Sequence, residues 1–118
     1  MTPTQETNQA GPLSYGADLI KAERLRQIHG EGWDVKNDDE NDEGEMLLGA
    51  NSYIQSVLTP NQHPEHKRKF ILSMYWPRQW TQNWFKPTTA IRDLVKAGAL
   101  IAAEIDRLKR LEAQPHDT

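Results

Sequence analysis

Cysteine is absent from the 118-residue chain, and this absence excludes disulfide bonds, cysteine-ligated zinc sites and thiol catalysis together. No apolar run approaches the roughly 20 residues that a membrane-spanning helix needs. Residues 1–11 have neither a basic start nor an apolar stretch, so we expect no signal peptide. These absences favour a soluble protein that is located in the cytoplasm.

A basic surplus is also lacking, because 17 acidic side chains outnumber 14 basic ones and the formal net charge is −3. This balance argues against general nucleic-acid binding. The seven glycines are scattered, and no serine lies in a Gly-x-Ser-x-Gly turn. Neither a glycine-rich phosphate loop nor a serine triad is therefore indicated.

Hydrophobic spacing predicts an all-α fold with three main helices, in a single domain at 13–112 between disordered tails at 1–12 and 113–118. The first helix runs from about Ser14 to Ile28. The second begins near Asp42, where Asp42 and Glu45 are spaced as a capping box, and it ends before Pro60. The third begins after a cap at Thr88 or Thr89 and reaches about Glu112. Polar loop sequence fills 31–41, and a long aromatic-rich insertion separates the second and third helices at 59–87.

Each helix has an apolar stripe that we expect to face the core. The stripe of the first helix is Ala17, Leu19, Ala22, Leu25 and Ile28, and that of the second is Met46, Leu47, Ala50, Tyr53, Ile54 and Val57. The stripe of the third is Ile91, Leu94, Val95, Gly98, Ile101, Ala102, Ile105 and Leu108. Small residues at 97–103 would let a neighbouring helix come close. A core this thin predicts a homo-oligomer, in which another subunit completes it.

Acidic and basic side chains are segregated along the chain. Residues 31–45 hold eight acids and one base, whereas residues 65–96 hold seven bases and two acids. Aligning Gly44 with the invariant glycine of an EF-hand puts Ala50 at the twelfth position, where a glutamate is required. An EF-hand is thus excluded, and a looser Mg²⁺ or Ca²⁺ site in the acidic loop stays open. His63 and His66 lack a third ligand.

The richest candidate for chemistry is an aromatic and basic segment. Six of the nine aromatic residues fall within the sixteen residues 70–85, and basic residues interleave with them and follow them. Aromatic faces stack on bases and cations neutralise phosphates, so this composition suits a nucleotide. Alternatively, most of the rings cover the small core. Lys96 either pairs with a carboxylate such as Glu45 or Glu23, or faces an anion. The candidate ligand-binding residues are Trp76, Arg78, Trp80, Trp84, Lys86, Arg92 and Lys96.

Several motifs together resemble a family of small phage and prophage proteins without an assigned activity. They are ERLRQ at 23–27, EGW at 31–33, DD at 38–39, GE at 44–45, WFKP at 84–87 and RDLVKAGALIAAEI at 92–105. This resemblance implies a phage accessory role in the cytoplasm of an infected host cell, and no particular chemistry.

Weaker similarity connects the chain to the MazG-like all-α nucleotide pyrophosphohydrolases, in which acids from two or more helices surround Mg²⁺. Glu45 and Asp93 lie where such acids would be. Leu48 and Gly49 replace a second carboxylate on the second helix, and Lys96 replaces one on the third. The metal ligands that this alternative implies are Glu23, Asp38, Asp39, Glu45 and Asp93.

Three functions are therefore expected, in this order. The first is binding and sequestration of a small anionic nucleotide-type ligand to counter a host defence signal, with no catalytic residue and no cofactor. The second is Mg²⁺-dependent nucleotide pyrophosphohydrolysis. The third is a protein-interaction module that docks a host protein through its charged segments and tryptophans.

Overall fold

The computed structural model of the protein describes residues 14–32, 35–60 and 63–114. Within these ranges the chain is helical and contains no strand, which confirms the all-α prediction. Its elements are α2 (Tyr15–Gly30), α3 (Val35–Glu40), α4 (Glu45–Leu58), α5 (Pro64–Met74), the short 3₁₀ helix η1 (Gln82–Trp84) and α6 (Ala90–Ala113). Of the two predicted tails, residues 1–12 and 115–118 lie outside the described residues, and Ala113 belongs to α6.

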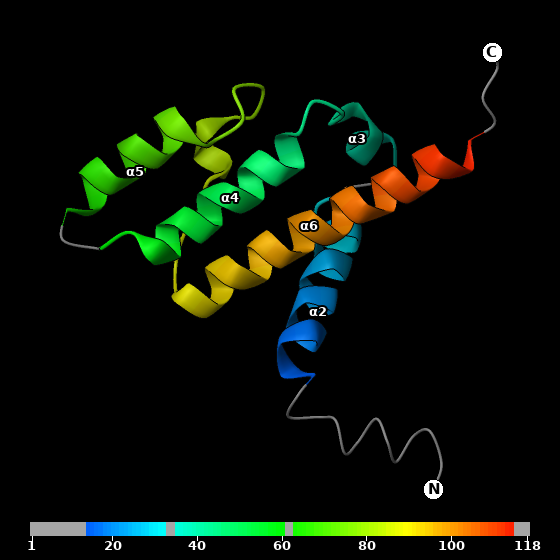
Figure 1. Cartoon of the computed structure of the whole chain (residues 1–118). Coiled ribbons are helices and arrows are strands. Elements are labelled where there is room, and N and C mark those ends of the chain that lie inside the picture. Colours follow the sequence, from blue (N-terminus) through cyan, green and yellow to red (C-terminus); the bar gives the residue numbers. More distant parts are fainter. Residues whose placement is uncertain (1–13, 33–34, 61–62, 115–118) are drawn as a thin grey trace, which may run out of the picture.

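The core lies between α4 and α6, which run side by side, with α5 on the far side of α4 (Figure 1). Helix α2 packs across α6 at a steep angle, and α3 contacts the later part of α6. The buried cluster consists of Met46, Ala50, Tyr53, Ile71, Trp76, Trp80, Phe85, Ala97, Leu100 and Ala103. Of the six aromatic residues at 70–85, Trp76, Trp80 and Phe85 belong to this cluster and Tyr75 packs against it, whereas Phe70 and Trp84 are exposed.

The start of α6 agrees with the cap that the sequence predicts, and the start of α4 differs from its predicted cap. The Thr89 side chain accepts a hydrogen bond from the Arg92 backbone at 3.2 Å, so the predicted cap is confirmed. Asp42 does not cap α4; Gly44 precedes the helix with a φ of 85°, a left-handed conformation that suits glycine. Glu45 still reaches back, and its Oε1 accepts from the Glu43 amide at 2.7 Å.

Two segments that we expected to be irregular contain helices. Helix α3 lies in the predicted polar loop, where it places Asp38 in the interior against Arg24 at 2.7 Å. Helix α5 lies in the predicted insertion and begins with Pro64 in its first turn, a position that proline tolerates well. Among the described residues, no helix combines the length and the apolar character that crossing a membrane demands.

The expected inner face of the first helix is wrong, and that of the third is wrong in part, since Val95 is buried as predicted. Helix α6 buries Val95 and Leu100 together with the small residues Ala97, Ala99 and Ala103. Five large residues of the expected stripe stay exposed, namely Ile91, Leu94, Ile101, Ile105 and Leu108. On α2, Ala17, Ala22 and Leu25 are exposed, Leu19 and Ile28 are half-buried, and the buried residues are Glu23 and Gln27. The buried face of α2 therefore consists of polar groups.

Gly98 lies where α2 crosses α6. A Cβ atom added there would lie 2.4 Å from Cδ1 and 2.7 Å from Cγ1 of Ile20. The close helix contact that the small residues predict is therefore made within the chain, by α2.

Candidate functional site

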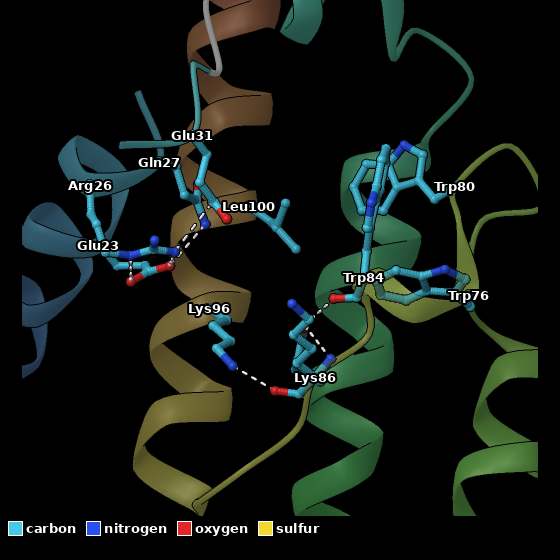
Figure 2. A pocket seen from close by; sticks show the side chains of 11 residues that line it. Glu23, Arg26, Gln27, Glu31, Trp76, Trp80, Trp84, Lys86, Lys96 and Leu100 are labelled. Atoms are coloured by element: carbon cyan, nitrogen blue, oxygen red, sulfur yellow. Dashed lines mark hydrogen bonds and ion pairs between the residues drawn. The ribbon is translucent and has the colours of Figure 1, made fainter. Parts of the chain in front are cut away.

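A hollow of about 200 Å³ opens between α2, α6 and the segment 76–84, which carries three tryptophans. Figure 2 shows its α2 side chains facing three indoles, with two lysines beside them. We call it the indole hollow. It is lined by Glu23, Arg26, Gln27, Glu31, Tyr53, Trp76, Trp80, Trp84, Lys86, Lys96 and Leu100.

The indole wall has two fixed rings and one accessible ring. The ring centroids of Trp76 and Trp80 are 5.4 Å apart in an edge-on arrangement, and those of Trp80 and Trp84 are 6.2 Å apart. The indole N–H of Trp76 donates to the Thr81 carbonyl at 3.2 Å, and that of Trp80 donates to Asn41 Oδ1 at 2.9 Å. Trp84 is 55% exposed, so its ring is the one that a ligand can stack on.

Close packing against a glycine fixes the position of Trp80. A Cβ atom at Gly49 of α4 would lie 2.6 Å from Cζ3 of the Trp80 ring. Only glycine therefore lets the indole lie this close to α4. Gly49 stands where the pyrophosphohydrolase pattern expects a carboxylate, and here it has a packing role.

Two lysines supply positive charge beside the indoles. Lys96 Nζ donates to the Lys86 carbonyl at 2.6 Å and lies 5.4 Å from the centre of the Tyr53 ring. Burial lowers the pKa of Lys96, the largest effect on this group, and the carboxylate of Asp93 opposes that shift. Neither lysine forms an ion pair within the described part of the chain, so the predicted pairing of Lys96 with Glu45 or Glu23 does not occur there.

Tyr53 fixes the backbone that carries these groups. Its hydroxyl accepts from the Lys86 amide at 3.1 Å and donates to the Trp84 carbonyl at 3.3 Å. Burial raises the pKa of Tyr53 above its usual value, so the hydroxyl stays protonated and can make both bonds. One side chain of α4 thereby positions both Trp84 and Lys86.

The α2 wall is organised around Glu23, which is 3% exposed. Arg26 donates to both of its carboxylate oxygens, at 3.0 and 2.8 Å, and Arg92 donates to Oε1 at 2.8 Å. Gln27 Nε2 donates to Oε2 at 3.2 Å. Hydrogen bonding to Arg26 is the largest effect and lowers the pKa of Glu23 to about 2, although burial opposes it. Glu23 is therefore ionised and holds two arginines and a glutamine in place.

Five of the seven candidate ligand-binding residues line this hollow: Trp76, Trp80, Trp84, Lys86 and Lys96. Arg92 reaches it only through Glu23, and Arg78 is exposed outside it. Their binding of a ligand stays a prediction. Arg26, Gln27, Glu31, Tyr53 and Leu100 were not among the candidates, although the polar i, i+3 and i+4 spacing of Glu23, Arg26 and Gln27 could have indicated a shared cluster.

The five carboxylates of the magnesium alternative, all among the described residues, do not form one metal-binding cluster. Glu23 pairs with arginines, Asp38 with Arg24, and Asp39 with Arg110 at 2.8 Å. Glu45 and Asp93 accept backbone N–H groups from Glu43 and Thr88. Among the described residues, no group of three histidine or acidic side chains is arranged to hold a metal ion.

A second, acidic hollow of about 620 Å³ adjoins the first and shares Glu31, Trp80 and Trp84 with it. Six carboxylates line it, those of Glu31, Asp38, Glu40, Asp42, Glu43 and Glu45. Six of the eight acids of residues 31–45 therefore lie on the acidic side of Trp80 and Trp84, and two of the seven bases of residues 65–96, Lys86 and Lys96, line the indole hollow. This field disfavours an anion on the acidic side and favours it beside the two lysines.

Comparison with protein-family models, with curated proteins and with solved structures finds no match to this chain. A functional assignment therefore rests on the fold and on the geometry of the indole hollow.

Proposed function

We propose that the protein binds a small anionic nucleotide-type ligand in the indole hollow. The observation that carries this proposal is an exposed indole face, that of Trp84, in one hollow with Lys86 and Lys96, whose ammonium groups form no ion pair among the described residues. Stacking on an aromatic ring suits any base, and the ammonium groups suit a phosphate. A volume of about 200 Å³ is small for a ligand pocket and suits one base-bearing unit.

The proposal includes retention of the ligand without conversion. The carboxylates that would hold Mg²⁺ are each engaged by an arginine or a backbone amide, and Lys96 faces the hollow where a second metal ligand is expected. Sequestration of a nucleotide in an infected cell would counter a host defence signal. That biological role rests on the resemblance of residues 23–105 to phage proteins.

Self-association is part of the same proposal. The exposed residues Ile91, Leu94, Ile101, Ile105 and Leu108 follow one another in steps of three, seven, four and three along α6. They follow the spacing of a helix that packs against another helix, and Gly98 between them is already packed against Ile20 of α2. A second copy of the chain offers the same spacing, so we propose that it covers this α6 stripe.

Isothermal titration with a panel of linear and cyclic nucleotides tests ligand binding. We expect micromolar binding by at least one member, and a loss of affinity of about tenfold or more in Trp84→Ala, because a base loses its stacking partner. Lys86→Ala should also weaken binding. Arg78→Ala is the matched control, because it removes one positive charge from an exposed site outside the hollow.

Three outcomes would count against this proposal. Absence of binding across the panel at tens of micromolar refutes the nucleotide site. Release of pyrophosphate from a nucleoside triphosphate, abolished in Glu45→Gln, would establish the hydrolase alternative instead. Capture of a host protein that survives nuclease and added nucleotide would favour the docking alternative.

A further inference from the structure

The amide of Gln27 presents an acceptor to which no described residue donates. Gln27 is 5% exposed and lines the indole hollow. Its Oε1 is buried and has no hydrogen-bond partner within the described part of the chain. A buried acceptor without a donor is destabilising, and a donor that enters the hollow would relieve that cost.

The orientation of this amide is determined by chemistry. Its partner Glu23 is ionised and therefore accepts hydrogen bonds only, so the amide must turn its nitrogen towards Glu23. Oε1 then has to point away from Glu23. Turning the amide over would place two acceptors against each other and would leave the nitrogen without its bond.

The guanidinium donors of the α2 wall bond to carboxylates of the same wall. Arg26 uses Nε and Nη2 on Glu23, and Nη2 also contacts Glu31 Oε2 at 3.3 Å. Glu31 is a second acceptor on this wall and is shared with the acidic hollow. A group that meets Gln27 and Glu31 must therefore donate hydrogen bonds, and preferably two of them.

The charges around the hollow fix which end of a nucleotide meets this wall. Lys86 and Lys96 attract the phosphate, and the carboxylates of the acidic hollow repel it. In Figure 2 the α2 side chains lie across the hollow from the indoles, so a nucleotide that enters between them has Trp84 on one side and Gln27 on the other.

From these four observations we infer that the hollow selects nucleotides whose base carries an exocyclic amino group, which donates to Gln27 Oε1. This inference rests on the proposed function and adds its specificity. An amino group supplies two N–H donors, one for Gln27 and one for Glu31. A carbonyl at the same ring position would place an acceptor against an acceptor.

Adenosine and inosine monophosphates provide the test, because they differ at the exchange of one amino group for a carbonyl oxygen. Guanosine monophosphate differs from the inosine nucleotide by one added amino group. We expect the inosine nucleotide to bind the wild-type protein about tenfold more weakly, or worse, than the better of the other two. Equal affinity for all three overturns this inference alone. Absence of binding by all three refutes the proposed function, and the inference with it.

A variant assigns the preference to one residue. Gln27→Met keeps the length of the side chain and removes this acceptor, so the ratio of the affinities should fall severalfold, with the Glu31 carboxylate still in place. Gln55→Met is the matched control, since Gln55 lies on α4 outside both hollows. A Gln27→Met variant that keeps the full preference overturns the assignment. The comparison of nucleotides on the wild-type protein stands even if this variant does not fold.

Discussion

Glu23 explains why a polar helix face can be buried here. An isolated carboxylate in the interior is strongly unfavourable, but this one accepts four hydrogen bonds, two from Arg26 and one each from Arg92 and Gln27. The arrangement links α2 to the first turn of α6. It also positions the Gln27 amide, to which we assign the proposed base preference.

The depressed pKa of Glu23 predicts a particular pH dependence of stability. Its folded-state value is about 2 and its usual value is 4.5. The contribution to stability is therefore complete above about pH 4.5 and is lost as the pH falls towards 2. We expect the difference in unfolding free energy between wild type and Glu23→Gln to shrink by about 2 kcal/mol from pH 7 to pH 3. Urea unfolding at both values measures it, and a difference independent of pH would contradict the ion-pair assignment.

Lys96 gives a prediction in which stability and binding separate. Its ammonium is partly desolvated and has no carboxylate partner within the described part of the chain, so Lys96→Met removes an unfavourable burial without leaving a carboxylate unpaired. The melting temperature should stay level or rise. Affinity for the adenosine nucleotide should fall by about tenfold or more, since a charged contact to phosphate is lost. A lower melting temperature with unchanged affinity would remove Lys96 from the site.

At the scale of elements, the long helix was predictable and the inner faces were not. Thr89 and the extended helical pattern after it determine where α6 begins, because both signals are local. Which stripe of α6 faces inward depends on how closely α4 and α2 approach. Ala99 and Ala103 are buried completely, whereas Ile105 is 59% exposed. The hydrophobicity of the residues alone therefore does not predict which stripe of α6 faces inward.

The residues of the candidate site also divide into those that the sequence could indicate and those that it could not. Its tryptophans and lysines could be selected from the sequence because they cluster within residues 76–96. Tyr53 could not be selected in this way, because its hydroxyl bonds to Trp84 and Lys86, which are 31 and 33 positions away along the chain. Glu23 and Arg92 are 69 positions apart, and their pairing exists only once α2 crosses α6.

That crossing can be tested at Gly98. Gly98→Ala places a methyl group against Ile20 and should lower the unfolding free energy by about 1–3 kcal/mol. In an Ile20→Ala background the same change should cost less, and a double-mutant cycle of chemical unfolding measures this coupling. Gly16→Ala is the control, because nothing lies within 4 Å of the added atom. Equal costs in both backgrounds would argue against the close contact.

At the scale of the whole molecule, the chain leaves an unusual amount of large apolar surface exposed. Among the described residues, fifteen large hydrophobic side chains are exposed, and six of them lie on α6. Scattered exposed residues are ordinary, but exposed apolar residues that recur at helical spacing are the basis of the proposed self-association. None of the α6 stripe residues lines the indole hollow. The proposed self-association and the proposed ligand binding therefore involve different residues of the same helix.

A charge at Ile105 should separate assembly from ligand binding. Ile105→Lys puts an ammonium group in the apolar stripe, and burying it unpaired against a second copy is strongly unfavourable. Sedimentation should show a wild-type protein that is dimeric or larger at micromolar concentration, and a variant shifted towards monomer. Leu58→Lys is the control, because it changes another exposed apolar residue, at the end of α4, that is not part of the α6 stripe. A monomeric wild-type protein would contradict self-association. Because Ile105 does not line the hollow, the dissociated variant should keep the wild-type affinity for the adenosine nucleotide.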